Sequence, residues 1–477
     1  MFQGAALRLT RKLLLAHAKR MDPQRMLERS RQGALCVAAR AALCSKAYRV
    51  LLREHGLEPD ALRHETDLGR LPVLTKANTF GRFSLDELSR PIDTREIADV
   101  LTSSGRSGHS FGFKLTVRKQ HESSWFDIDL GLQDAFNVDE KPTLLVNCLP
   151  MGVAFRSRAV TVANVSVRED MACSILRDVG PRFAQTILCT DPLFIRRILD
   201  EGQRRGIDWR SLNTSVIVGE EMLVEPQREY IAKCMGLDLE TEPQRMIGSS
   251  FGVGELGLNL LFETRCTIHL QRKLRAARST ADRGADAYGE GAAPQLLCYN
   301  PMRCHVEVLN PDSSGFGELC FTMLDRQAVI PLPRFATGDL GRMLARPTIS
   351  AHADRARLMT PWLPVVELHG RIADRSTDLP SVEQVKEWIY SDHLIAHQLS
   401  GAFRLVSQPR GGARLTLQLT GDARAEEDVR TRIQEIARLY GFTDLQVESL
   451  SASEFPWRPM LDFERKFPYL SGARSHG

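Results

Sequence analysis

Residues 185–221 read QTILCTDPLFIRRILDEGQRRGIDWRSLNTSVIVGEE and set the pattern for the middle of the chain. Two short apolar runs, 185–190 and 214–218, flank a segment in which apolar residues recur at helical spacing. Asp191 is suited to cap that helix, and Pro192 fits its first turn. A strand, a helix and a second strand in this order are typical of an α/β unit with parallel strands. The segment therefore predicts a mainly parallel sheet covered by helices.

The same alternation extends outward from this unit. Apolar runs at 143–150 (TLLVNCLP) and 161–167 (TVANVSV) precede it. The residues up to about 63 show helical spacing, which predicts an outer layer of two or three helices. After residue 305 the apolar runs become short and are separated by Gly and Pro, which indicates a small β subdomain.

Beyond residue 369 the pattern predicts a separate α+β module. A helical segment at 381–391 (SVEQVKEWIYS) is followed by two strand-like runs, a second helical segment and a last strand-like run. We therefore expect an α/β protein of two domains. The large N-terminal domain would span residues 1–368, and a small, mobile C-terminal lid domain would span residues 369–477.

Composition narrows the classes of function. The chain has 477 residues, of which 43% are hydrophobic, enough for a large core. Its 63 basic and 59 acidic residues are spread along the chain, so we expect no nucleic-acid partner. No run approaches the roughly 18 apolar residues of a membrane span. Ten cysteines without a secretory signal are typical of reduced thiols, so we expect a cytoplasmic protein.

The N-terminal segment 7–20 (LRLTRKLLLAHAKR) is basic and amphipathic and contains no acidic residue. Such a composition fits a transit peptide or a helix that lies on a membrane surface. It also fits an ordinary first helix whose charged side faces water. The sequence leaves both interpretations open.

A loop rich in Ser and Gly follows an extended segment near residue 100. It reads TSSGRSG at 102–108, so its backbone can approach an anion while hydroxyls and a guanidinium donate hydrogen bonds. The candidate phosphate contacts are Ser103, Ser104, Gly105, Arg106, Ser107 and Gly108. The loop is not a Walker A sequence. Taken alone it also fits a simple turn.

Two further loops carry a carboxylate beside glycine. The segment 248–257 (GSSFGVGELG) presents Glu255 where it can hold a hard cation. The segment 334–339 (RFATGD) presents Asp339, which is suited to accept hydrogen bonds from paired ribose hydroxyls. The alternatives are an ordinary glycine loop and an Asp-stabilised turn.

The order of these motifs is more specific than any one of them. The Ser/Gly loop, the Phe-Gly-x-x-Glu segment and Thr-Gly-Asp are followed by GRIAD at 370–374 and by a late lysine. This order resembles the adenylate-forming superfamily of acyl-CoA synthetases, adenylation domains and luciferases. Within it, the phenylacetate-CoA ligase-like branch is the most similar. The resemblance covers most of the chain.

The resemblance implies a role for each motif. The loop 103–108 would grip the triphosphate of ATP, Glu255 would bind Mg²⁺, and Asp339 would bind the ribose. Lys466 would bridge the substrate carboxylate and the α-phosphate, with Arg465 as a rival for that role. The remaining nucleotide contacts would come from Gly219, Glu220, Phe251, Gly252 and Arg371.

The implied activity is ATP-dependent conversion of a carboxylic acid into an acyl-adenylate, with release of pyrophosphate and transfer of the acyl group to CoA. The implied cofactors are ATP, Mg²⁺ and CoA, and the partners are a small-molecule carboxylic acid and, in a homodimer, a second copy of the chain. An amine, a carrier protein or a protein thiol is an alternative acceptor. A further alternative is a nucleotide-binding partner protein without catalysis.

Several positions depart from the family pattern. Arg106 and His109 replace a Thr and a Lys of the phosphate loop. Gly254 stands where a Ser or Thr hydroxyl is usual, and Ala373 replaces an acidic residue at the hinge. These departures leave adenylation better supported than formation of the thioester.

A zinc site is a separate hypothesis. Cys266 and His269 form a C-x-x-H pair, and Cys298 and Cys304 lie beyond a charged insertion. Four such ligands suit tetrahedral Zn²⁺. The alternative is a set of buried thiols in the core.

Overall fold

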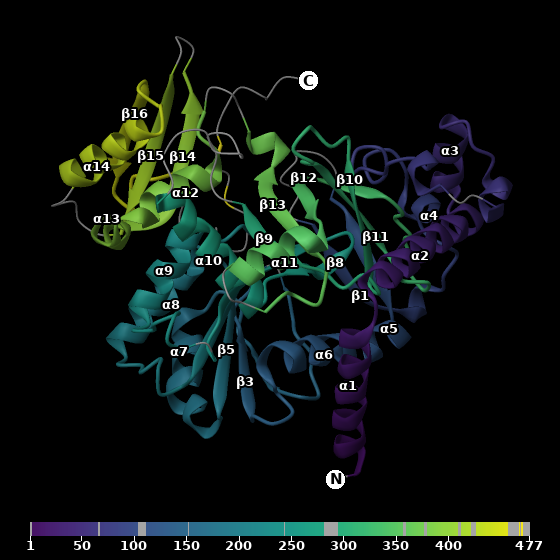
Figure 1. Cartoon of the computed structure of the whole chain (residues 1–477), viewed down its shortest axis with the longest axis horizontal. Coiled ribbons are helices and arrows are strands. Elements are labelled where there is room, and N and C mark those ends of the chain that lie inside the picture. Colours follow the sequence, from purple (N-terminus) through teal and green to yellow (C-terminus); the bar gives the residue numbers. More distant parts are fainter. Residues whose placement is uncertain are drawn as a thin grey trace.

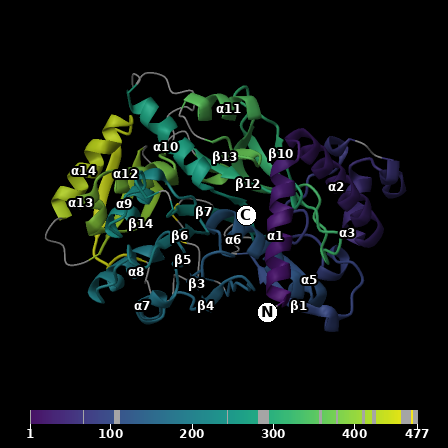
Figure 2. The same cartoon turned by 60° about the horizontal axis from the view of Figure 1, so that its bottom comes forward.

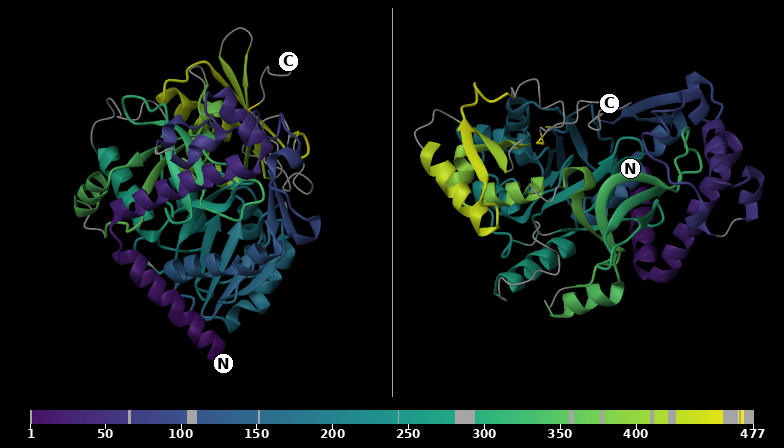
Figure 3. Two further views of the ribbon diagram at one scale, coloured as in Figure 1. Left: turned by 90° about the vertical axis from the view of Figure 1, so that its right-hand side faces the viewer. Right: turned by 90° about the horizontal axis from the view of Figure 1, so that it is seen from above.

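The computed structural model describes most of the chain, as a large body with a smaller C-terminal unit at one end (Figure 1). The described residues are 2–64, 67–103, 111–150, 152–242, 244–280, 294–355, 359–375, 379–408, 412–420, 426–456, 467 and 469–470. The smaller unit lies at the opposite end of the molecule from helices α2 (Pro23–Cys44) and α3 (Lys46–Glu54) (Figure 3).

The N-terminal region is helical, as the sequence predicts. Its elements are α1 (Phe2–Arg20), α2, α3, η1 (Pro59–His64), η2 (Leu68–Arg70), α4 (Leu85–Leu88) and η3 (Thr94–Glu96). Asp22 caps α2 by accepting a hydrogen bond from the Arg25 N–H, and Ser45 caps α3 by accepting one from the Tyr48 N–H. None of the described helices combines the length and the apolar composition needed to cross a bilayer.

The predicted α/β core is confirmed. Its strands are β3 (Thr143–Asn147), β4 (Thr161–Asn164), β5 (Gln185–Thr190), β6 (Thr214–Val218) and β7 (Ile247–Val253). They pair in parallel in the order β4-β3-β5-β6-β7 and lie side by side in Figure 2. The intervening helices are α7 (Glu169–Asp178), η4 (Gly180–Arg182), α8 (Phe194–Arg204) and α9 (Glu225–Cys234).

The later strands continue the same sheet. They are β8 (Gly257–Phe262), β9 (Gln295–Cys298), β10 (Cys304–Leu309), β11 (Gly317–Met323), β12 (Phe335–Leu344) and β13 (Val365–Arg371). They pair antiparallel, and β7 joins the two halves because it also pairs antiparallel with β8. The described residues thus form one sheet of 11 strands, in which the predicted β subdomain is the antiparallel half.

The remaining elements of the large body flank this sheet. They are the paired strands β1 (Ile97–Thr102) and β2 (Phe113–Val117) and the helices α5 (Arg118–Ser123), α6 (Trp125–Phe136), α10 (Arg265–Thr280) and α11 (Arg346–Arg355). Arg11 of α1 is buried and forms an ion pair with Asp139. The basic N-terminal segment is therefore attached to the large body by a buried ion pair of one of its arginines.

The C-terminal unit has the predicted α+β composition. Its elements are η5 (Ile372–Asp374), α12 (Val382–Ser391), α13 (His393–Gln398), β14 (Leu399–Ser407), β15 (Ala413–Leu419), α14 (Glu426–Leu439) and β16 (Leu445–Leu450). A capping box formed by Ser381 and Gln384 begins α12. One buried apolar cluster includes Phe194 of α8, Tyr230 of α9 and Trp388 of α12, so the two units share a core.

Candidate active site

Of the predicted nucleotide contacts, Gly219 and Glu220 follow the carboxyl end of β6, and Phe251 and Gly252 are among the last residues of β7, at the edge where ligands of α/β sheets bind. After β6, the Gly219 N–H donates a hydrogen bond to the Thr190 carbonyl over 2.9 Å. Glu220 then adopts a φ of 71°, in the left-handed region that few side chains favour. Strained backbone of this kind is concentrated at functional sites.

Lys76 contacts both Glu255 and Ser103. The Lys76 ammonium lies 2.8 Å from the buried Glu255 carboxylate and donates a hydrogen bond to the Ser103 hydroxyl over 2.9 Å. The Gly112 N–H also donates to that hydroxyl, over 3.0 Å. The sequence does not predict Lys76 as a site residue, because its partners are distant along the chain. The three side chains gather a cation, a hydroxyl and a carboxylate in one cluster.

Two glycines allow this close approach. A Cβ at Gly112 would overlap the Glu255 side chain, and a Cβ at Gly254 would lie 2.7 Å from the Ser103 Cα. The backbone of Ser103 therefore takes the space that a side chain at 254 would need. This contact gives a packing reason for the departure at Gly254 from the family pattern.

Asp339 and Arg371 are neighbours on adjacent strands. They face each other across the β12–β13 pair, and the Arg371 Nε lies 3.6 Å from the Asp339 carboxylate. Asp339 is buried, whereas the Arg371 side chain is 38% exposed. Gly370 has a φ of 82°, and a Cβ there would lie 2.7 Å from the Glu383 carboxylate. The predicted ribose acid and the hinge arginine therefore lie together.

The aromatic residue of the glutamate loop lies against a second ring. Phe251 is partly buried, and its ring stacks on that of Phe321 with centroids 6.0 Å apart and 24° between the planes. A Cβ at the neighbouring Gly252 would lie 3.0 Å from the Leu258 Cα. Of the other predicted site residues, Ser104, Gly105, Arg106, Ser107, Gly108 and Lys466 lie outside the described residues.

The structure does not gather the four candidate zinc ligands. Cys298 and Cys304 belong to different buried clusters. Burial raises the pKa of the Cys304 thiol to about 12 and lowers the pKa of His269. Among the described residues, which include Cys266 and all its predicted partners, no group of three or more His, Cys, Asp or Glu side chains is arranged to hold a metal. The thiols are buried in the core or in contact with the backbone, as Cys266 is with the Met359 carbonyl.

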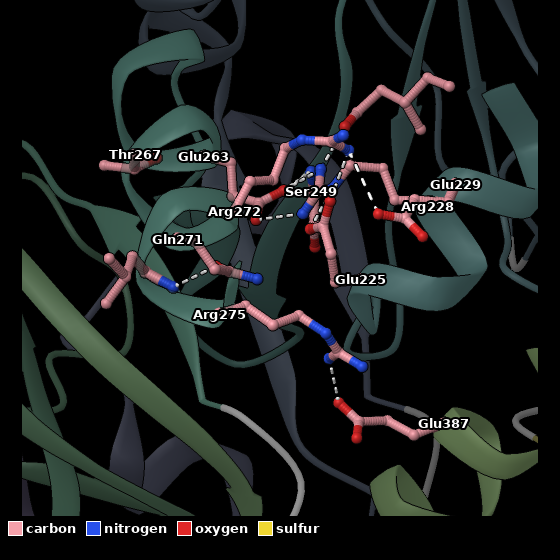
Figure 4. A network of polar contacts seen from close by, with 12 residues as sticks. Glu225, Arg228, Glu229, Ser249, Glu263, Thr267, Gln271, Arg272, Arg275 and Glu387 are labelled. Atoms are coloured by element: carbon pink, nitrogen blue, oxygen red, sulfur yellow. Dashed lines mark hydrogen bonds and ion pairs between the residues drawn. The ribbon is translucent and has the colours of Figure 1, made fainter. Parts of the chain in front are cut away.

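A buried ionic network that the sequence does not predict anchors β7. Arg228 of α9 is fully buried and forms ion pairs of 2.8 Å with Glu225 and 2.7 Å with Glu263 (Figure 4). Glu263 in turn accepts a hydrogen bond from the Ser249 N–H of β7 over 2.8 Å. The network therefore fixes the strand that leads into the glutamate loop.

The C-terminal unit contacts the segment after β6. Lys386 of α12 forms a buried ion pair of 2.6 Å with Glu221, and the Tyr469 hydroxyl donates to the same carboxylate over 2.8 Å. Burial, and after it the nearby Glu221, raises the pKa of Asp191 to about 7. The C-terminal unit is thus joined to Glu221, directly beside the predicted nucleotide contacts Gly219 and Glu220.

Comparison with known proteins establishes the fold of the chain. No family model and no curated protein matches the sequence, whereas solved structures match its fold. The chain has the fold of the adenylate-forming ligases, as the order of its motifs predicts.

One such structure is 2-hydroxyisobutyryl-CoA ligase in the postadenylation state, with a TM-score of 0.68 and 13% identity over 96% of this chain and 92% of that chain. An open conformation of that ligase, in complex with 2-HIB-AMP and CoA, gives a TM-score of 0.53 and 14% identity over 93% of this chain and 91% of that chain. The same ligase in its thioesterification state gives a TM-score of 0.54 and 13% identity, over 96% of this chain and 91% of that chain. At these identities the likeness establishes the fold.

Proposed function

We propose that this protein activates a carboxylic acid with ATP, forming an acyl-adenylate and releasing pyrophosphate, and then transfers the acyl group to CoA. The observation that carries the proposal is the cluster of Lys76, Ser103 and Glu255 beside the Ser/Gly loop. It brings together the groups that a triphosphate and its cation require. The motif resemblance supports an aryl or medium-sized acyl acid, and a cytoplasmic homodimer as the working form.

Glu255 fits Mg²⁺. Its carboxylate is buried beside a single described cation, Lys76, and Mg²⁺ is commonly bound by one or two carboxylates together with substrate phosphates. When bound there, Mg²⁺ would offset the negative charge of the departing pyrophosphate. Lys76 would hold Glu255 and Ser103 in place and add a second positive charge near the phosphates.

The other groups would orient the nucleotide and stabilise the reaction. The Asp339 carboxylate would accept hydrogen bonds from the two ribose hydroxyls, and the exposed part of Arg371 would contact the nucleotide. A cation at Lys466 would stabilise the charge that develops as the substrate carboxylate attacks the α-phosphorus.

Acid-dependent release of pyrophosphate from ATP tests the proposal. The wild-type protein should release pyrophosphate with at least one acid in a panel of aryl and aliphatic acids. Lys466→Ala should lower the rate about a hundredfold, which corresponds to about 3 kcal/mol in the transition state. Arg465→Ala is the matched control, because it removes the neighbouring cation, and should keep most of the activity.

Equal rates for Lys466→Ala and the wild type would remove Lys466 from the reaction. Binding of ATP without release of pyrophosphate for any acid would favour a nucleotide-binding partner protein over a ligase.

A second candidate keeps the adenylate and changes the acceptor to an amine, a carrier protein or a protein thiol. Ala373 at the hinge, where the family pattern has an acid, favours it. The residues on either side of the predicted hinge are linked to each other, because the Arg375 guanidinium donates a hydrogen bond to the His369 carbonyl over 2.7 Å. Product analysis with CoA and with amine acceptors separates the two candidates.

A further inference from the structure

Helix α1 presents an apolar face to the solvent. Ala5, Leu9, Leu13 and Ala16 follow one another at steps of three and four residues, so they lie on one side of the helix. All four are exposed, Leu9 by 59% and Leu13 by 61%. A helix on the surface of a protein normally turns its apolar side to the core and its polar side to water. In α1 the apolar side faces water instead.

Charged side chains attach α1 to the large body. Three of its basic residues form ion pairs with acidic residues that lie on α6 or directly after it. These pairs are Arg11 with Asp129 and Asp139, Lys12 with Glu140, and Lys19 with Asp134. Leu9 and Leu13 belong to none of the apolar clusters of the described residues. The helix is thus held by charge, and its leucines are left on the outside.

The position of α1 makes this face accessible. In Figures 1 and 3 the helix runs along the outside of the large body and carries the N-terminus at its far end. Of residues 4–20, only Arg11 is buried. A helix in this position is convex, so it fits a flat surface and offers no groove to a partner protein.

The charge around the apolar face is positive. Residues 1–21 contain no Asp or Glu. Arg8 and Arg20 are exposed, and neither forms an ion pair with a residue that the structure describes. A second copy of the chain that paired α1 with α1 about a two-fold axis would bring these like charges together. A negatively charged surface would be attracted to them.

We propose that α1 docks this protein on a membrane surface that contains anionic lipids. Leu9 and Leu13 would enter the boundary between headgroups and acyl chains, and Arg8 and Arg20 would contact the lipid phosphates. Leucines on one face and basic residues beside them are the composition of helices that lie in the plane of a membrane surface. The helix would lie on the bilayer without crossing it. This docking goes beyond the proposed function and does not depend on it.

Co-sedimentation of the full-length protein with lipid vesicles tests the proposal. The wild type should bind vesicles of equal parts phosphatidylglycerol and phosphatidylcholine, and bind far less to phosphatidylcholine alone or at raised salt. Leu9→Gln/Leu13→Gln should bind the anionic vesicles about ten- to a hundredfold more weakly. Leu43→Gln is the matched control, because Leu43 is a leucine of α2 that is 58% exposed. It should bind as the wild type does.

A second variant separates charge from apolar contact. Arg8→Gln/Arg20→Gln should weaken binding to the anionic vesicles about tenfold and leave the weak binding to phosphatidylcholine unchanged. All four replaced side chains are exposed, so both double variants should unfold at the urea concentration of the wild type.

Absence of wild-type binding to the anionic vesicles would overturn the proposal, and so would equal binding by Leu9→Gln/Leu13→Gln. Light scattering tests the second copy. A wild-type dimer that becomes a monomer in Leu9→Gln/Leu13→Gln, with no vesicle binding by either, would assign the face to a second copy of the chain and would also overturn the proposal.

Discussion

Two charged clusters on and beyond β7 differ in how completely their charges are enclosed. Arg228 and its carboxylate partners Glu225 and Glu263 are all buried, and the guanidinium also donates to the Ile247 carbonyl. Glu255 is buried too, but the side chain of its partner Lys76 is 22% exposed. The enclosed cluster holds the strand, and the open cluster leaves a cation accessible to a charged ligand. One strand is thus anchored at its first half and open to ligand just beyond its end.

The largest effect should come from breaking the enclosed cluster. Arg228→Ala leaves Glu263 buried without its cation and should lower the free energy of unfolding by about 3–5 kcal/mol. Urea denaturation measures the loss. Arg168→Ala removes an exposed ion pair with Asp170 and should leave the stability nearly unchanged. Equal losses for the two variants would show that the enclosed cluster does not anchor β7.

A smaller loss of stability is expected at Gly254, where the backbone of Ser103 in the open cluster leaves no space for a side chain. Gly254→Ser restores the hydroxyl that is usual in the family but forces a Cβ to within 2.7 Å of the Ser103 Cα. The substitution should cost about 1–3 kcal/mol of stability and lower pyrophosphate release with it. Gly131→Ser, at an exposed helical position with no atom within 4 Å of its Cβ, should not destabilise. Faster pyrophosphate release by Gly254→Ser would contradict the packing argument.

The smallest effect, when it is taken per pH unit, is the pH dependence of stability that Asp191 causes at the contact between the two units. Because the pKa of Asp191 is raised to about 7, the folded protein keeps a proton there that the unfolded chain has already lost. Stability should therefore fall as the pH rises from about 4 to about 7, by on the order of 1 kcal/mol per pH unit, and then level off. Burial of the Asp191 carboxyl is the main cause of this raised pKa, and the nearby Glu221 and Glu220 carboxylates raise it further, whereas hydrogen bonds from the backbone N–H groups of residues 193 and 194 lower it.

Asp191→Asn should flatten this pH dependence, which denaturation at several pH values between about 5 and 8 would measure. Asp170→Asn is the control, because a hydrogen bond from Arg168 lowers the pKa of Asp170 to about 2, outside that range. A slope that survives in Asp191→Asn would assign it to another group.

Periodicity was sufficient to predict the α/β core and the C-terminal α+β unit, because each depends on local patterns of apolar residues. The alternation around residues 185–221 corresponds to β5, α8 and β6. The separate β subdomain was less predictable, since the sheet is joined through β7, whose second edge pairs with β8. Pairing of this kind depends on distant partners and leaves no local pattern.

The motifs predicted Ser103, Glu255, Asp339 and Arg371, and the structure places them in two pairs. Their roles toward ATP stay predictions. Lys76, Arg228 and Lys386 could not be predicted, because each acts through a carboxylate or hydroxyl brought close only by the fold. The zinc hypothesis is not supported for the same reason. The spacing of Cys and His along the sequence does not determine which strands become neighbours, and the fold does not bring the four candidate ligands together.

The position of β7 inside the sheet limits how the chain can be divided. It bonds to β6 on one edge and to β8 on the other, so a break on either side of it would leave two long sheet edges unpaired. Unpaired edges recruit strands from other chains and promote aggregation. Fragments that end between β6 and β8 should therefore be poor soluble products, and the large body is best regarded as one indivisible unit of folding.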